Sequence, residues 1–196
     1  VDKNGTEVTA KYTPTVKPVT PTAEGVTTTD VQGATQKGKP AFEAGKTTVN
    51  GVEKTVELDD TKPATFEDGS TTKEVPGEGT YTVAPDGTVT FTPEKSFTGQ
   101  ATGVTVKRED KNGTPVTAQY TPVVLPVTPT SKDVTSIGEK GAKQFETPVF
   151  KAGSTKLNGK TITVPIDETV APTLEGADKD GKVVVPGEGT YTIDKN

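Results

Sequence analysis

The chain contains the same stretch twice. Its opening run, VDKNGTEVTAKYTPTVKPVTPT (residues 1–22), returns with few changes as EDKNGTPVTAQYTPVVLPVTPT (residues 109–130), an offset of 108 positions. This period is far longer than the roughly 20–50 residues of a solenoid repeat and matches a whole independent domain. The sequence therefore predicts tandem copies of one fold.

The correspondence continues beyond these runs, because apolar anchors and turn residues keep their places while polar residues vary. The motif VPGEGTYT begins at Val75 and again at Val185, so the second copy gains two residues and the offset becomes 110. This pattern is typical of two copies of one structure. The other matched positions are Val26 and Val134, Phe42 and Phe150, Asn50-Gly51 and Asn158-Gly159, and Phe66 and Leu174.

Pro-rich segments mark the expected boundaries. KPVTPT (residues 17–22) and LPVTPT (residues 125–130) each hold two prolines, which fix φ and favour an extended, stiff linker. Residues 1–22 are then the tail of a preceding repeat plus its Pro-rich linker. Residues 23–130 are a complete repeat plus linker, and residues 131–196 are a truncated following repeat.

The composition favours strands over helices. Thr supplies roughly one residue in five and Val most of the aliphatic side chains, and both are β-branched. Hydrophobic residues make up only 29% of the chain, so any core is thin and disorder is an alternative. The apolar alternation and the turn chemistry agree over nearly the whole repeat, which favours a folded domain.

Three hairpins are expected inside the complete repeat. KTTVNGVEKTVEL (residues 46–58) turns at Asn-Gly, which accepts the positive φ of a type I′ turn. GTYTVAPDGTVTFTP (residues 79–93) alternates apolar residues on both sides of its turn. ATGVTVKRED and TPVTAQYTPVV (residues 101–110 and 114–124) form the last pair, with Val104 and Val106 facing inward.

About seven short strands, with turn signals every 8 to 12 residues, predict an all-β fold. We expect Ig-like antiparallel β-sandwich beads in tandem, joined by short Pro-rich linkers. The core is expected to be rich in valine. Its large members are Phe42, Phe66, Tyr81, Phe91, Phe97 and Tyr120.

Several function classes lose support because key residues are missing. The chain has no Cys and no His, which removes thiol chemistry, the usual general base and the commonest zinc ligand. A pI near 4.9 argues against nucleic acid as a partner. No apolar run approaches the roughly 20 residues that span a membrane, and Val1 does not begin a signal peptide. We expect an interior fragment with no membrane partner.

Acidic turns offer one alternative function. DKNG at Asp2 and Asp110, APDG at Asp86 and DKDG at residues 178–181 present carboxylates on tight turns, as calcium loops do. Only the last motif spaces two acids one residue apart, and no bidentate Glu follows at the EF-hand distance. Plain Asx turns are favoured.

Two further alternatives use carboxylates near strands. Glu78, repeated as Glu188, could assist a Lys to Asn isopeptide crosslink, but no Lys or Asn can be paired with it from the sequence. Asp59-Asp60 and Asp167-Glu168 could act as acid and base, yet they lie in turns without aromatic neighbours to line a cleft. The sequence predicts no enzyme, no catalytic residue, no cofactor and no metal site.

The longest distinctive run lies near the end of the complete repeat. VPGEGTYTVAPDGTVTFTPEKSFTGQATGVTVKREDKNGTPVTAQYTPVV (residues 75–124) resembles the CshA-type fibril repeat of streptococcal cell-wall-anchored adhesins. The resemblance covers the complete repeat, and both partial copies fit it. It implies a large surface protein whose non-repetitive distal region binds host fibronectin and other ligands. Tandem repeats then form the fibril that holds this region away from the cell.

Two functions follow as expectations. The first is a structural stalk that projects the distal region and bears load, with neighbouring repeats of the same chain as partners. Host fibronectin or other bacteria would be met only through the distal region, and the parent protein would be extracellular and anchored to the cell wall. The second is a weakly adhesive module that acts by avidity. The large side chains recur mainly at presumed core positions, which favours the stalk.

Overall fold

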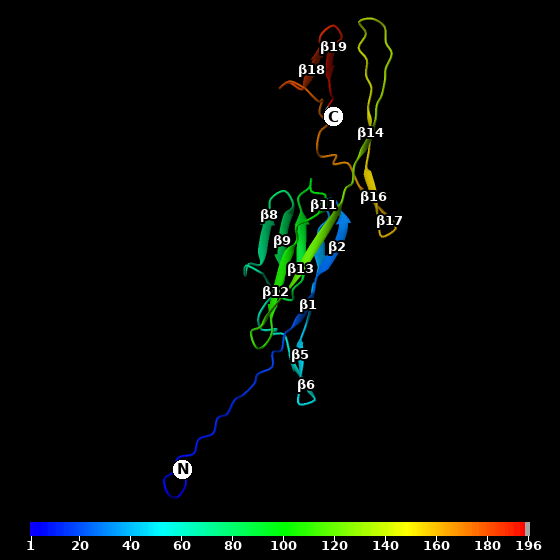
Figure 1. Cartoon of the computed structure of the whole chain (residues 1–196). Coiled ribbons are helices and arrows are strands. Elements are labelled where there is room, and N and C mark those ends of the chain that lie inside the picture. The colour runs from blue at the N-terminus through cyan, green and yellow to red at the C-terminus, as the bar shows by residue number, and fades with distance from the viewer. Residues whose placement is uncertain (195–196) are drawn as a thin grey trace. The chain divides into compact units, whose positions relative to one another are not determined.

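The computed structural model describes residues 1–194 (Figure 1), which contain strands and no helix. The chain divides into two compact units, one of residues 1–126 and one that begins at Val127. The all-β prediction is therefore confirmed. Within the described residues, no helix is long and apolar enough to cross a membrane.

The first unit contains thirteen strands, which form two larger sheets and two separate strand pairs. They are β1 (Thr22–Glu24), β2 (Val26–Val31), β3 (Gln36–Gly38), β4 (Ala41–Glu43), β5 (Gly45–Val49), β6 (Val52–Val56), β7 (Thr65–Phe66), β8 (Thr72–Val75), β9 (Gly79–Val83), β10 (Val89–Pro93), β11 (Gly99–Gln100), β12 (Val104–Glu109) and β13 (Pro115–Leu125).

One sheet has four strands in the order β3-β10-β9-β8, and the other has five. The five-stranded sheet runs β11-β13-β12-β7, and β2 also pairs with β13. The pairs β1-β4 and β5-β6 stand outside both sheets. The core lies between the two larger sheets, so the unit is a β-sandwich.

The pairing of β2 with β13 corrects the expected all-antiparallel arrangement. These strands run parallel, in a register from Val26 opposite Tyr120 to Val31 opposite Leu125. Parallel neighbours need a long connection, and here the whole intervening domain supplies it. Hairpin signals in the sequence indicate pairing only between strands that are consecutive in the chain, and β2 and β13 are not consecutive.

The three expected hairpins are confirmed as the antiparallel pairs β5-β6, β9-β10 and β12-β13. The first turns at Asn50 and Gly51, with φ values of 52° and 78°. Both values lie in the left-handed region that a type I′ turn requires, and Asn and Gly are the residues that adopt it most readily. Local chemistry therefore sets this turn.

The core follows the alternation of the strands that face each other across the sandwich. Phe66, Tyr81, Phe91 and Tyr120 are fully buried, and Phe42 and Phe97 pack against them from partly exposed positions. The Tyr81 ring stacks on Phe91 at 4.5 Å and meets Tyr120 edge-on at 6.5 Å. Because Tyr81 is on β9 and Tyr120 on β13, this contact joins the two sheets.

The second unit repeats three of these strand pairs in matching register. β14-β15, β16-β17 and β18-β19 are the counterparts of β1-β4, β5-β6 and β8-β9. Within residues 127–194, only Gly153 is buried. The bounds are β14 (Thr130–Lys132), β15 (Val149–Lys151), β16 (Gly153–Leu157), β17 (Lys160–Val164), β18 (Lys182–Val185) and β19 (Gly189–Thr192).

Candidate functional site

In the acidic turns considered for calcium, the Asp carboxylates accept hydrogen bonds from backbone N–H groups of the same turn. Asp110 Oδ1 accepts hydrogen bonds from the N–H groups of Asn112 and Thr114, at 2.9 and 2.8 Å. Asp2 and Asp178 make the same bonds in their own turns. No group of three or more acidic side chains in residues 1–194 is arranged to hold a metal ion. These motifs are Asx turns that close hairpins or loops.

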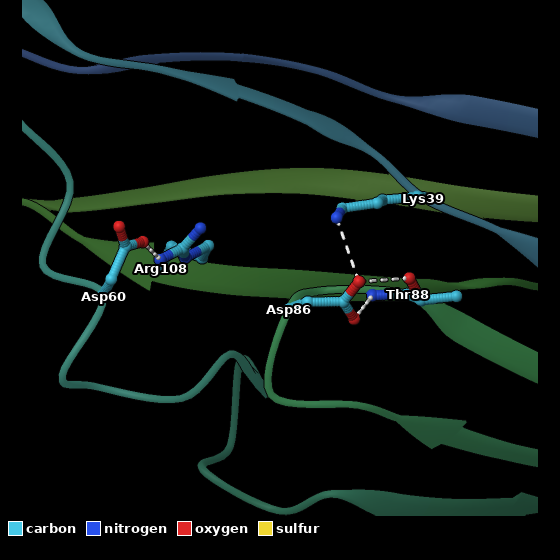
Figure 2. Close-up of polar contacts among 5 residues, drawn as sticks. All are labelled: Lys39, Asp60, Asp86, Thr88 and Arg108. Carbon is cyan, nitrogen blue, oxygen red and sulfur yellow. Dashed lines mark hydrogen bonds and ion pairs between the residues drawn. The ribbon is translucent and has the colours of Figure 1, made fainter.

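The fourth acidic turn also carries an ion pair (Figure 2). Asp86 accepts hydrogen bonds from the backbone and hydroxyl of Thr88, and Lys39 Nζ lies 2.9 Å from its carboxylate. The Thr88 backbone bond, followed by the Lys39 contact, lowers the pKa of Asp86 to about 2. Both side chains are 56% exposed, so the pair contributes little to stability.

The paired carboxylates Asp59 and Asp60 bond to different partners. Asp59 accepts bonds from the hydroxyl and backbone of Thr61, which lower its pKa. Asp60 Oδ1 lies 2.8 Å from Nη2 of Arg108 on β12, and Figure 2 shows this ion pair. Each carboxylate therefore ties the loop before β7 either to itself or to the five-stranded sheet. The second pair lies in the other unit, where Asp167 accepts bonds from Thr169.

Glu78, the residue considered for a crosslink, holds a loop instead. Its carboxylate accepts hydrogen bonds from the backbone N–H and the hydroxyl of Thr102. Thr102 lies just before β12, and the next residue, Gly103, donates its N–H to the Tyr81 hydroxyl at 3.3 Å. Burial raises the pKa of that hydroxyl to about 12. In the second copy, Glu188 instead accepts a bond from Tyr191.

The most developed polar arrangement lies where β2 meets β13. Thr28 Oγ1 donates to Gln36 Oε1 at 2.6 Å, so its single proton is used. The Tyr120 hydroxyl, 2.8 Å away, therefore donates to Thr28 Oγ1. Gln36 Nε2 donates to the Val123 carbonyl at 2.9 Å. We call Thr28, Gln36, Tyr120 and the Val123 carbonyl the seam network.

The seam network joins three strands from both sheets. Thr28 lies on β2, Tyr120 and Val123 on β13, and Gln36 on β3 of the four-stranded sheet. Gln36 is 4% exposed and Tyr120 fully buried, so each of these bonds satisfies a group with little access to water. Burial also raises the pKa of Tyr120. The network therefore fastens the first long strand to the last.

Sequence reasoning missed this network. Thr28 is one of three consecutive threonines, and nothing local distinguishes it from Thr27 or Thr29. The alignment of the two copies offers one indication of the network: a hydroxyl and a Gln side chain occur at the same positions in both, Thr28 and Gln36 in the first and Ser136 and Gln144 in the second. Those two side chains form the same hydroxyl-to-amide bond, at 2.6 Å.

The fold defines a class of protein, a β-sandwich repeat in tandem. A protein-family model described as the surface adhesin CshA repetitive domain matches residues 18–124 and again residues 126–196. The two matches cover most of the chain, so it belongs to this family. The resemblance seen in the sequence is thereby confirmed.

Part of the chain is also similar in sequence to a solved structure. The chain is similar to repeat domain 13 of the fibrillar adhesin CshA from Streptococcus gordonii, determined by NMR, at 66% sequence identity. The match covers 34% of this chain and 86% of that one, with a TM-score of 0.21. No protein with curated annotation matches the chain.

Family membership gives the coarse function. The chain is a repeat of a surface adhesin family, which implies an extracellular location at the cell surface, and this family is not a class of enzymes. Adjacent copies in the same chain are its immediate neighbours.

Proposed function

We propose that the repeat is a mechanical spacer in the stalk of the adhesin. In this proposal the tandem repeats project a distal ligand-binding region from the cell wall, to which the parent protein is anchored. Contact with host fibronectin or with other bacteria then belongs to the distal region alone. Each repeat contributes length and resists the tension that adhesion creates.

The observation that carries the proposal is the parallel pairing of β2 with β13. The chain enters this pair at Val26 and leaves it at Leu125, and these residues lie at opposite ends of the seam. Tension on the chain therefore slides the two strands along each other and loads their hydrogen bonds together. The bond from Gln32 N to the Leu125 carbonyl, at 2.9 Å, extends the seam past β2.

Proline within β13 is placed where it does not weaken the seam. Pro122 accepts a hydrogen bond at its carbonyl from Ala101 N, at 2.9 Å. Because the N and O of one strand residue point to the same side, its missing donor faces the loop between β11 and β12. The side of β13 that pairs with β2 keeps its donors. The seam network adds side-chain bonds across the same pair.

The surface of the complete repeat offers little for an adhesive module. Among the large hydrophobic residues within 23–126, only Val52 is exposed, with 54% of its surface accessible. The single Arg, Arg108, is largely buried and bound to Asp60. Binding that acts by avidity needs exposed aromatic or Arg anchors at matching positions. The spacer is therefore preferred to the adhesive alternative.

The domain limits form part of the proposal. We place one repeat between the Pro-rich segments at residues 17–22 and 125–130, with residues 1–22 from the repeat before and residues 131–196 from the repeat after. Two observations bear on this division. The family matches begin at residues 18 and 126, and the compact units divide after Pro126.

A single-molecule experiment with two pulling directions tests the spacer. The natural chain has no cysteine, so introduced cysteines alone set the points of attachment. Glu24→Cys with Thr128→Cys pulls along the seam, whereas Glu24→Cys with Thr117→Cys pulls β2 and β13 apart at the end of the seam where Val26 lies opposite Tyr120. We expect a clearly higher unfolding force for the first pair, because shearing breaks many bonds at once and peeling breaks them singly.

Two results would contradict the proposal. Equal forces in the two directions would mean that the seam does not resist tension. Featureless extension without a step, in either direction, would mean that the repeat does not unfold as one cooperative unit.

A further inference from the structure

The Val-Thr pair inside each Pro-rich segment lies against the hairpin that follows it in the same unit. A Cβ built on Gly45 would lie 2.7 Å from the carbonyl carbon of Thr20 and 2.9 Å from Val19 Cγ1. At Gly153 the corresponding distances are 2.6 Å to Thr128 and 2.8 Å to Val127. Real Cβ atoms do not approach other atoms so closely, so only glycine permits the contact at either position.

The two contacts are the same contact in two copies. Val19 and Thr20 align with Val127 and Thr128 at the offset of 108, and Gly45 aligns with Gly153. Val19 and Val127 are half-buried, and both glycines are buried. In the first unit, Lys17 Nζ also donates to the Thr48 carbonyl at 2.9 Å, on the same hairpin.

The second unit shows that this contact does not depend on the sandwich. Residues 127–194 align with residues 19–84, so they contain no counterparts of β10 to β13. Their aromatic side chains Phe145, Phe150 and Tyr191 are exposed. Yet Gly153, beneath the Pro-rich segment, is buried as Gly45 is. The Pro-rich segment therefore contacts the β16-β17 hairpin although the second unit has no buried aromatic core.

We propose that residues 19–21 and 127–129, which we call the docking segments, are the first structural element of the repeat that follows them. Each is seated on its hairpin, β5-β6 or β16-β17, in a notch that the glycine leaves open. The partner of this hairpin surface is thus a Val-Thr-Pro segment of the same chain. This inference does not rest on the mechanical proposal, and it moves the start of each repeat from residues 23 and 131 to residues 19 and 127.

The docking segment shortens the free connection between repeats. Strand β13 ends at Leu125, and Val127 already contacts the hairpin of the next unit. Only Pro126 remains between them, and its ring fixes φ. The extended string of six residues expected from the sequence is then reduced to a single residue of limited freedom.

NMR relaxation on the whole chain tests the docking. Val127 and Thr128 carry amide protons, and Ile137, in an exposed segment without strands, serves as the internal reference for mobility. We expect heteronuclear NOE values at Val127 and Thr128 close to those of the β16-β17 hairpin and well above that of Ile137. In Gly153→Ala, the new methyl collides with the Thr128 backbone, so both values should fall to the level of Ile137.

Two further variants separate docking from hairpin stability. Ser154→Ala changes the neighbouring exposed residue and should leave Val127 and Thr128 rigid. Val127→Ser weakens the contact from the other side without touching the hairpin, so the NOE should fall at residues 127 and 128 while the β16-β17 signals persist. Wild-type values already equal to that of Ile137, or unchanged values in both Gly153→Ala and Val127→Ser, would overturn the inference. Neither result bears on the forces measured along the seam.

Discussion

The two copies in this chain share their hairpins but not their burial. Tyr81 on β9 and Tyr191 on β19 occupy the same place in the same strand pair, in the same register. Tyr81 is completely buried, whereas Tyr191 is 51% exposed. The same strand pairs are therefore present in both units, but the buried aromatic core belongs to the first unit, whose described residues include β10 to β13.

The seam network makes the same distinction at the level of one bond. Thr28 donates to Gln36, and Ser136 donates to Gln144, both at 2.6 Å. The first bond links β2 to β3 and connects to Tyr120, while neither Ser136 nor Gln144 lies in a strand. A short-range contact thus forms in both copies, but it fastens strands only where β13 and β10 pair with them.

The largest test of this comparison replaces the matched tyrosines. Tyr81→Ala should destabilise the first unit by about 3–5 kcal/mol, because it leaves a large cavity between the sheets. Tyr191→Ala should change the unfolding of the chain by less than about 0.5 kcal/mol. Chemical denaturation followed by far-UV circular dichroism measures both. Similar losses for the two variants would mean that the second copy has a core of its own.

The next test removes the hydroxyl at the centre of the seam network. Thr28→Val leaves the Tyr120 hydroxyl without its acceptor and Gln36 Oε1 without its donor, at an expected cost of about 1–3 kcal/mol. Thr27→Val, on an exposed position of the same strand, is the control and should be almost neutral. Ser136→Ala should be neutral too, because its bond is exposed. A neutral Thr28→Val would show that the network contributes nothing to the seam.

A smaller difference is expected at the aligned phenylalanines. Phe42 is partly buried against the core, while Phe150 is 60% exposed. Phe42→Ala should therefore cost about 1–2 kcal/mol, and Phe150→Ala much less. Thermal unfolding of the two variants, compared with wild type, gives the difference. Equal shifts in the midpoint would remove the distinction between the two positions.

The smallest effect concerns pH. The pKa of Asp86 is lowered from 3.8 to about 2, so its contribution to stability is present above the ordinary value and is lost as the pH falls through about 2. Thr147 aligns with Lys39, so the second copy has no equivalent ion pair. An NMR titration of the Asp86 carboxyl should place its midpoint below that of an ordinary Asp. In Asp86→Asn, the loss of stability of the first unit at low pH should be only slightly smaller than in wild type.

Much of the fold could be predicted from the sequence because much of it is local. Asn50-Gly51 specifies its turn through the φ values it accepts, and alternation along residues 79–93 identifies the buried face. The parallel seam could not be predicted in this way. Its strands are separated by nearly the whole domain, and no turn signal connects Val26 with Tyr120.

The candidate sites show the same limit. The sequence favours Asx turns at the acidic motifs because such turns are local, and the bonds of Asp110 reach only two and four residues ahead. The role of Gly45 could not be predicted, because glycine has no side chain to reveal what approaches it. Only the position of Thr20 and Val19 explains why a larger residue is excluded there.

By itself, the sequence determined that the chain is made of tandem copies, that these copies form strands, and where their hairpins turn. These properties depend on the φ preferences and side chains of residues close together in the chain, so both copies express them. Tertiary structure alone decided which aromatic rings are buried, that the first long strand pairs with the last, and that the Pro-rich segment lies on a hairpin. Those outcomes require contacts between segments that are distant in the chain. In the second copy, residues 127–194 form strand pairs without those contacts, and Tyr191 is exposed.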